Sequence, residues 1–445
     1  MTVYGARPWL KLYPGWVPPE LPLPRASAID QFRATVREHA DRPAVYYFDT
    51  VLTYRELDRL SSALAVGLSR LGIGKGDRVA LYLQNVPQFW IAQLAAWKLG
   101  AVVVPLNPMF KADELKYHLK DSGAAVLVAL ESLYGEVAAP VVGELNLKGV
   151  VTTSELDFLG SGPRPAVLAG ATRLRPRETL DLLEVCDRHA GAPDPAVPVG
   201  PEDIAYLTYT SGTTGVPKGA MNTHLNVAFN AEVYRVWMRL GPADVVVGAA
   251  PVFHITGMVG HLAVAALTGM PVILAYRFDA GEILRLIERW RGSFLVAAVT
   301  AYIALMNHPD LGRRDLSSLK KAYSGGAPVP PAVVEQFRRL TGIYIHHIYG
   351  LTETTSPSHA VPLGTEAPVL PEYGALSVGV PVPNTGCRVV DLETGADVPP
   401  GQVGEVVIRG PMVVPGYWQK PAETARALRD GWLYTGDVGL MDEAG

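Results

Sequence analysis

The ten residues 210–219, TSGTTGVPKG, crowd hydroxyls, glycines and one lysine together at the end of the strand-like run DIAYLTYT, residues 203–210. Glycine lets a backbone approach a ligand closely and enter left-handed turns. A row of free backbone N–H groups, together with hydroxyls and one ammonium group, suits a polyphosphate. An ordinary loop would not need so many special residues in one place, so the stretch predicts a phosphate-binding loop.

This loop differs from the Walker A loop of nucleotide hydrolases. A Walker A loop has four residues between its first glycine and a Gly-Lys pair, a Ser or Thr after the lysine for magnesium, and a helix that begins at once. Here Pro217 precedes Lys218 and Gly219 follows it, and we expect the next helix only from about Thr223. The pattern therefore argues against a Walker-type hydrolase.

Composition limits what the loop can belong to. The chain has 445 residues, 49% of them hydrophobic and 18% charged, which suits a globular protein of roughly two to four domains. A net charge of -4 gives no overall attraction to nucleic acid or to an anionic membrane. The only cysteines, Cys186 and Cys387, lie far apart in sequence, which argues against a disulfide framework and for a reducing cytoplasm.

Neither the hydropathy along the chain nor the N-terminal sequence predicts a membrane-spanning segment or a secretory signal. The first 25 residues carry proline and charge where a secretory signal needs an unbroken apolar core. The run from Met258 to Tyr276 comes near membrane-spanning length, but His261 lies inside it and the sequence TGMP at 268–271 breaks it. We expect a buried helix followed by a buried strand there.

Alternating helix-like and strand-like segments predict a layered α/β fold. Thr53 and Glu56 form a capping box, and leucines line one face of the helix that follows until Gly72. The strand-like run DRVALYLQN, a helix at 87–98 and the buried strand GAVVVPLNP come next. Alternation resumes after residue 200 with a helix at 224–237 and the strand-like run VVVGAAPV at 245–252.

Changes in composition and in predicted secondary structure along the chain suggest three structural units. Residues 188–202, RHAGAPDPAVPVGPE, have no apolar periodicity and should link two subdomains. Short strands broken by Gly and Pro, such as GCRVVDLETG and GEVVIRG, begin near residue 375. We expect a first α/β unit at 1–190, a second at 200–355 that carries the phosphate loop, and a small β-rich unit at 356–445.

Further motifs complete a resemblance to a known family. They follow YTSGTTGVPKGA in order: PVFHITG (251–257), YSGGAP (323–328), YGLTET (349–354), GEVVIRGPMVVPGYW (404–418) and GWLYTGD (431–437). Together with LTYREL and GAVVVPLNP upstream, they resemble the adenylate-forming superfamily of acyl-CoA synthetases, aryl-CoA ligases, firefly luciferase and peptide-synthetase adenylation domains. The resemblance covers the chain from about residue 28.

The resemblance implies a fold and its limits. Members have two layered α/β subdomains with mixed sheets flanked by helices, plus a small β-barrel-like subdomain. They then continue through a hinge into a C-terminal lid domain with a second lysine and a face for coenzyme A. The present sequence stops at MDEAG, 441–445, so we expect only the N-terminal portion, with the lid domain absent, adenylation impaired and thioester formation doubtful.

The family reaction suits the phosphate loop. A carboxylate attacks the α-phosphorus of ATP and pyrophosphate leaves, so positioning and charge neutralisation supply most of the catalysis. In the full-length enzyme, coenzyme A then accepts the acyl group. By resemblance, Lys218 adds a cation to a loop that wraps the β- and γ-phosphates, which consists of Thr210, Ser211, Gly212, Thr213, Thr214 and Gly215.

The YGLTET motif combines an aromatic ring, a hydroxyl and a carboxylate. By resemblance Tyr349 packs on adenine, Thr352 contacts the α-phosphate and Glu353 helps to hold Mg²⁺, with Gly350 beside them in the nucleotide site. A hard cation that bridges phosphate oxygens prefers an oxygen ligand, which suits a glutamate. Outside this motif, Glu353 would be interpreted as a solvated surface carboxylate.

Other motif residues receive roles in the same way. Gly325, Gly326 and Ala327 lack bulk and would let the backbone lie against the purine and the acyl group, although a plain strand-to-helix turn explains them equally. Asp437 resembles the aspartate that binds both ribose hydroxyls, a diol that suits two carboxylate oxygens. His254 would border the carboxylate and acyl site as a catalytic residue beside Lys218, Thr352 and Glu353.

Two adjacent histidines, His346 and His347, invite a metal interpretation. Neighbouring residues on a strand point to opposite faces, so a shared metal is not expected. His347 stands where the family has an amide residue and would face the adenine.

The sequence narrows the class of the acid substrate but does not identify the acid. FHITGMVG (253–260) offers no aspartate to pair with the ammonium of an amino acid, and an unpaired buried ammonium is very costly. A simple fatty or aryl acid fits better. Two alternatives stay open, namely a module that binds ATP and acyl-adenylate without turnover, and a ligase that transfers to a carrier-protein thiol. No nucleic-acid partner is expected, and a homodimer is left open.

Overall fold

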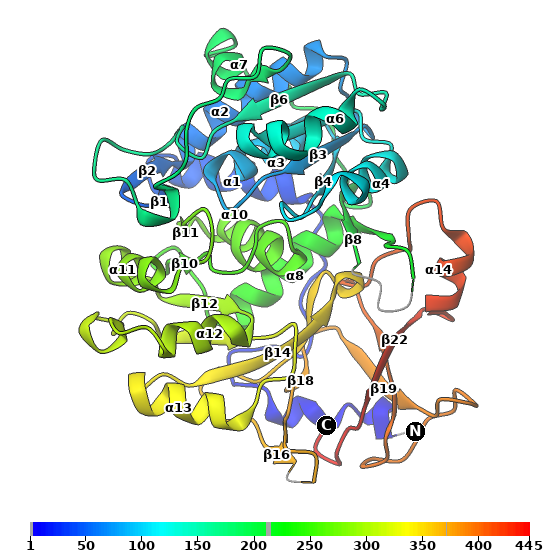
Figure 1. Ribbon diagram of the computed structural model, residues 1–445. Coiled ribbons are helices and arrows are strands. Elements are labelled where there is room, and N and C mark those ends of the chain that lie inside the picture. The colour runs from blue at the N-terminus through cyan, green and yellow to red at the C-terminus, as the bar shows by residue number, and fades with distance from the viewer. Residues whose placement is uncertain (1–2, 211–214, 371) are drawn as a thin grey trace.

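The computed structural model in Figure 1 describes residues 3–210, 215–370 and 372–445. The described residues form two large sheets, of nine and seven strands, and two smaller ones. The central sheet has the order β18-β15-β14-β13-β12-β10-β11-β1-β2. Its strands are β1 Pro43–Tyr47, β2 Thr50–Thr53, β10 Val246–Val247, β11 Val272–Leu274, β12 Phe294–Ala297, β13 Lys321–Ser324, β14 Ile345–Leu351, β15 Ser356–Ala360 and β18 Val380–Pro381.

The N-terminal sheet has the order β7-β6-β5-β3-β4-β8-β9. Its core strands are parallel, whereas β8 and β9 form an antiparallel hairpin at its edge. Apolar residues of β3 to β5 are buried, as expected for parallel strands covered on both faces. The strands are β3 Arg78–Tyr82, β4 Val102–Pro105, β5 Val126–Leu130, β6 Gly149–Thr153, β7 Leu180–Asp181, β8 Ile204–Tyr209 and β9 Gly219–Thr223.

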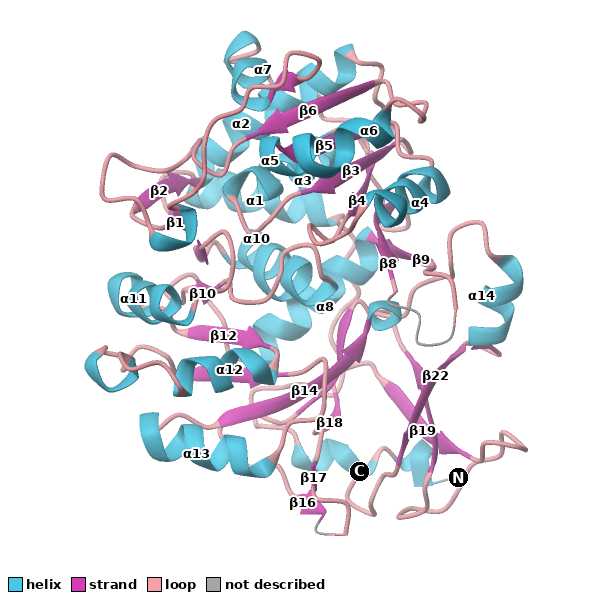
Figure 2. Cartoon of the chain, viewed as in Figure 1, coloured by secondary structure: helices cyan, strands magenta, loops and turns pink. Residues whose placement is uncertain are grey.

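Helices flank both large sheets, which confirms the predicted layered α/β class (Figure 2). The helices are α1 Ala28–His39, α2 Tyr54–Arg70, α3 Pro87–Lys98, α4 Ala112–Ser122, α5 Glu131–Leu133, α6 Ala139–Val142, α7 Leu182–Arg188, α8 His224–Trp237, α9 Ile255–Gly257, α10 Val264–Thr268, α11 Ala280–Trp290, α12 Val299–Met306, α13 Pro331–Thr341 and α14 Pro421–Ala427.

Several local predictions are confirmed. Thr53 and Glu56 form the expected capping box at the start of α2. The run 258–276 folds as buried helical turns followed by the buried strand β11. In the part of the chain that the structure describes, no helix is both long and apolar enough to cross a membrane. Cys186 and Cys387 are buried and unpaired with each other.

Sheet membership crosses the expected unit boundaries in both directions. Residues 188–202 are predicted to link two subdomains, and the strands β8 and β9 that follow them belong to the N-terminal sheet. Conversely β1 and β2, from the first expected unit, belong to the central sheet, where β1 pairs with β11 and β2 pairs with β1. Alternation of helix and strand cannot say which sheet a strand joins, because that depends on long-range pairing. The exact domain limits stay a prediction.

The small β-rich region is built on a four-stranded antiparallel sheet of described residues in the order β19-β20-β22-β21. The chain's first residues pack beneath it. The Tyr4 hydroxyl donates to Val398 O at 2.8 Å, and Asn384 exchanges two hydrogen bonds with the backbone of Leu21. Both chain ends therefore lie on one side of the molecule (Figure 1). The strands are β19 Gly386–Val390, β20 Gly404–Arg409, β21 Leu428–Arg429 and β22 Trp432–Gly439, and a short hairpin joins β16 Val369–Leu370 and β17 Ala375–Leu376.

Candidate active site

The predicted phosphate loop lies in the chain between β8 and β9, which pair as antiparallel neighbours. Tyr209 pairs with Gly219 across the two strands, and Thr210 N donates to Lys218 O at 3.0 Å, so the base of the loop is closed. Gly215 is exposed. The predicted residues Ser211, Gly212, Thr213 and Thr214 lie outside the described residues.

Lys218, Tyr417 and Glu353 form a short chain of contacts beside this loop. The Lys218 Nζ lies 4.6 Å from the centre of the Tyr417 ring. The Tyr417 hydroxyl donates to Glu353 Oε1 at 2.6 Å. Burial and the neighbouring Glu353 carboxylate raise the pKa of Tyr417, so its hydroxyl keeps its proton and its role as donor. Tyr417 thus connects the predicted loop lysine to the predicted metal ligand.

Backbone pairing explains why Tyr417 lies there. Trp418 N donates to Gly219 O at 2.8 Å and Met221 N donates to Gly416 O at 3.0 Å, so residues 416–418 run along the outer edge of β9. Val414 N donates to the carbonyl of Glu353 at 2.9 Å. One segment therefore holds the phosphate loop on one side and the YGLTET motif on the other.

The YGLTET motif spans the end of β14 and a 3₁₀ turn, Thr352–Thr354. The amide of Asn222 on β9 donates to Thr352 O at 3.0 Å and to Thr355 Oγ1 at 2.9 Å. A Cβ on Gly350 would lie 1.9 Å from Ser356 O. Only glycine therefore lets β14 and β15 approach so closely, which gives Gly350 a structural reason beside its predicted place in the nucleotide site.

Tyr349 and Asp437, predicted to bind adenine and ribose, contact each other directly. The Tyr349 hydroxyl donates to Asp437 Oδ2 at 2.6 Å. Burial, with the Asp437 hydrogen bond in addition, raises the pKa of Tyr349. Asp437 itself is exposed on β22. The contact brings the central sheet and the small sheet together at the predicted nucleoside position.

Gly325, Gly326 and Ala327 follow β13 beside these residues. A Cβ on Gly325 would lie 2.4 Å from Ile348 O, so this glycine is needed for packing against β14. Gly326 has φ of +80° and open space around it. His347 is buried with Nδ1 3.2 Å from Ser377 O, and burial lowers its pKa while backbone groups, including that of Ala327, oppose the shift.

The remaining predicted histidines, His346 and His254, have different surroundings. His346 lies with Nδ1 3.1 Å from Ala322 O and stacks on Tyr323, so it is part of the core. Within the described residues no cluster of three or more His, Cys, Asp or Glu side chains could hold a metal. His254 is exposed and caps α9, where its Nδ1 accepts from Thr256 N at 3.3 Å.

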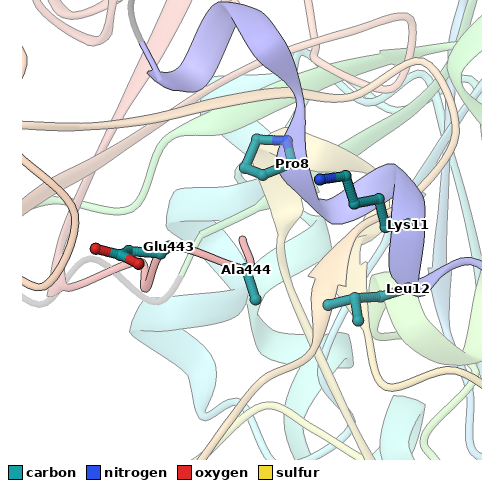
Figure 3. Close-up of a pocket in the computed structure, with 5 residues that line it drawn as sticks. All are labelled: Pro8, Lys11, Leu12, Glu443 and Ala444. Atoms are coloured by element: carbon teal, nitrogen blue, oxygen red, sulfur yellow. The ribbon is translucent and has the colours of Figure 1, made fainter.

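A cavity of about 320 Å³ lies elsewhere, between the two chain ends (Figure 3). It is lined by Pro8, Lys11, Leu12, Glu443 and Ala444. It shares no residue with the cluster of motif side chains, so it is not part of the candidate site.

Sequence reasoning missed the residues that hold the motifs in place. Tyr417 lies in the motif GEVVIRGPMVVPGYW. The residues beside it in the sequence do not indicate that it contacts the phosphate loop or the YGLTET motif. Asn222 carries no local signal, although its carboxamide holds the turn that bears Thr352 and Glu353. Both roles arise from contacts between segments that are distant in sequence.

Comparison with known proteins identifies a family for this chain. The family described as AMP-binding enzyme matches residues 32–418. A long-chain-fatty-acid–CoA ligase of Bacillus subtilis (strain 168) is 35% identical over 453 residues, which cover 99% of this chain and 79% of the relative.

Solved structures of CoA ligases share the fold. An anthranilate CoA ligase, AuaEII, in complex with anthranoyl-AMP superposes with a TM-score of 0.84 at 26% identity, over 96% of this chain and 77% of that one. A long-chain-fatty-acid-CoA ligase, FadD1, from Archaeoglobus fulgidus superposes with a TM-score of 0.82 at 29% identity, over 97% of this chain and 85% of that one.

Proposed function

The chain belongs to the AMP-binding enzyme family, whose acyl-CoA ligases are its relatives, and we propose that it activates a carboxylic acid with ATP. In this reaction a carboxylate oxygen forms a bond to the α-phosphorus, and the bond from that phosphorus to the pyrophosphate oxygen breaks. An acyl-adenylate and pyrophosphate result. In the full-length enzyme the acyl group is then transferred to the thiol of coenzyme A, which loses its proton, and AMP leaves.

One observation supports this proposal most strongly: the contact chain from Lys218 through Tyr417 to Glu353. It sets a cation and a carboxylate on either side of one aromatic residue next to the loop of glycines and hydroxyls. Because two anions must approach each other in adenylation, a fixed cation at the phosphates lowers the barrier by electrostatic stabilisation. Lys218 is assigned this role.

Glu353 is assigned to Mg²⁺. It is half-buried and its carboxylate is oriented by Tyr417. Mg²⁺ in nucleotide sites is held by one or two carboxylates together with phosphate oxygens and water, so a single oriented carboxylate fits that donor set. When bound, the ion would neutralise phosphate charge. Thr352, one residue before Glu353, is assigned to the α-phosphate.

The nucleoside is assigned to the contact between β14 and β22. Tyr349 offers an aromatic face for adenine, and Asp437 is exposed with two oxygens for the ribose diol. Burial lowers the pKa of His347, and the backbone of Ala327 is close enough to oppose this shift, which supports the assignment of both residues to the nucleoside site. Ligand hydroxyls on Asp437 would replace its present hydrogen bond from Tyr349.

An apolar acid is the proposed substrate. His254 is followed by a stretch that is almost entirely buried and apolar up to Thr268. The relatives named above include ligases for long-chain fatty acids and for anthranilate, so both fatty and aryl acids are candidates. A cytoplasmic location and a homodimer stay predictions.

Carboxylate-dependent ATP–pyrophosphate exchange tests the proposal. Straight-chain and aromatic acids are compared on the unaltered protein, on Lys218→Ala and Glu353→Gln, and on the control Lys11→Ala, an exposed lysine far along the chain from the site. We expect exchange that both site variants abolish and the control retains, and the best acid identifies the substrate class.

Two other outcomes separate the alternatives. Binding of a non-hydrolysable acyl-adenylate analogue without any exchange would replace the proposal by a binding module. Exchange with acyl transfer to a carrier-protein thiol, and none to coenzyme A, would keep adenylation and change the acceptor.

A further inference from the structure

Helix α4 contacts the phosphate loop at its exit. The Tyr117 hydroxyl donates to Pro217 O at 2.8 Å. Pro217 directly precedes Lys218, so this bond fixes the peptide group that leads into the lysine. Tyr117 belongs to none of the sequence motifs that define the site.

The same helix contacts the loop at its entry. The Tyr209 hydroxyl donates to Asp121 Oδ2 at 2.7 Å, and Tyr209 directly precedes Thr210. Tyr117 and Asp121 are four residues apart, so they lie one above the other on a single helix face. A carboxylate acceptor makes this a charge-assisted and therefore stronger hydrogen bond.

Asp121 also extends the contact to the segment that carries Tyr417. Its Oδ1 lies 3.3 Å from the Lys420 Nζ, and Lys420 N donates to Tyr417 O at 3.2 Å. Helix α4, strand β8 and the start of α14 therefore lie side by side around the loop (Figure 2).

Aromatic side chains pack against this face of α4. His118 is buried, stacks on Phe110 at 4.4 Å and meets the Tyr209 ring edge-on at 4.6 Å. Its Nδ1 lies 2.6 Å from Glu114 O of its own helix. The helix face that accepts the Tyr209 hydrogen bond therefore also packs against the Tyr209 ring.

We propose that α4 clamps both ends of the phosphate-binding hairpin, with Tyr117 and Asp121 as positioning residues that set Lys218 against Tyr417 and Glu353. The inference rests on the proposed function. The hydrogen bonds at Tyr209 and Pro217 fix the two described ends of the loop, so Lys218 does not have to be repositioned when a polyphosphate binds. The clamp acts on ATP and not on the acid.

Tyrosine-to-phenylalanine variants test the clamp, because each removes a single hydroxyl. Tyr117→Phe and Tyr209→Phe are compared with Tyr13→Phe, a matched control whose hydroxyl also donates to a proline carbonyl, Pro381 O, at 2.6 Å but far from the loop. ATP affinity is measured by calorimetry and KM for the acid by exchange. Since one hydrogen bond is removed in each, we expect about three- to tenfold weaker ATP binding in the two loop variants.

The KM for the acid, the thermal midpoints and the control variant decide whether the clamp explains the result. KM for the acid should stay unchanged, and the thermal midpoints of the loop variants should match that of Tyr13→Phe. Equal ATP affinity in all four proteins overturns the clamp and leaves the proposed function standing. Equal weakening in Tyr13→Phe also overturns it, because a general loss of stability would then explain the effect. No ATP binding by the unaltered protein overturns the proposed function and, with it, the clamp.

Discussion

Tyr417→Phe isolates one hydrogen bond at the centre of the site. The substitution keeps the aromatic ring 4.6 Å below the Lys218 ammonium and removes only the hydroxyl that donates to Glu353 at 2.6 Å. Without that bond the Glu353 side chain regains its rotamers in the free protein. Binding of Mg²⁺ and ATP must then immobilise it again, so the variant should bind both more weakly.

The size of the effect follows from side-chain entropy. Ordering a glutamate side chain costs up to about 1.5–2 kcal/mol, which corresponds to at most about a ten- to thirtyfold increase in Kd for Mg²⁺-ATP. Tyr417→Leu also removes the ring beneath Lys218, and a cation–π contact contributes a further ~0.5–2 kcal/mol. The leucine variant should therefore bind more weakly than the phenylalanine variant.

Calorimetric titration with ATP at several Mg²⁺ concentrations measures both effects. Tyr434→Phe serves as the control. Tyr434 also has a cation over its ring, because Arg429 Cζ lies 4.3 Å from the ring centre, but the pair lies in the small sheet and outside the site. The control should bind as the unaltered protein does. If Tyr417→Phe binds Mg²⁺-ATP with unchanged affinity and unchanged thermal stability, Tyr417 does not orient Glu353 and the reasoning is refuted.

Three further predictions concern stability. Gly350→Ala would place a Cβ 1.9 Å from Ser356 O and should lower the free energy of unfolding by about 1–3 kcal/mol in urea titrations, whereas Gly135→Ala, with open space, should not. Asn384→Ala removes both bonds to Leu21 and should release residues 3–21 to limited proteolysis while leaving the α/β sheets folded; equal protease resistance would contradict this. Acid should destabilise the protein, because burial lowers the pKa of His224 to about 3 and of His261, His346 and His359 to about 4. Below the ordinary histidine value of about 6.5 the unfolded chain binds protons that the native state does not, so the thermal midpoint should fall progressively from there towards pH 4, and a flat profile over that interval would contradict it.

Local elements could be predicted because their signals are local. The helices at 87–98 and 224–237 match α3 and α8 as expected, since Pro87 and Thr223 mark their starts and the apolar pattern covers their lengths. The strand-like run 245–252 predicted a strand that is longer than the observed one. Only Val246–Val247 pair as a strand there, because the length of a strand depends on the extent of its neighbours in the sheet.

The allocation of strands to sheets could not be predicted in the same way. Buried strands of both large sheets have the same apolar composition, so nothing in β1 or β8 distinguishes its sheet. The contacts of the N-terminal residues are another such case. The hydrogen bonds that join Tyr4 to Val398 and Leu21 to Asn384 depend on the folded surface of the small β-rich region.

What the sequence determined by itself is the set of chemical groups and their order along the chain: a glycine- and hydroxyl-rich loop with Lys218, a carboxylate at Glu353, a ring at Tyr349 and an acid at Asp437. Their types suit the phosphates, metal ion and ribose to which we assign them, because each of these contacts depends on a single side chain. What only the tertiary structure decided is which of them touch. The pairing of residues 416–418 with β9 places Tyr417 between Lys218 and Glu353, and α4 reaches both ends of the loop. Such contacts join segments far apart in sequence, and no local periodicity encodes them, because they form only when the two sheets and the small β-rich region have packed.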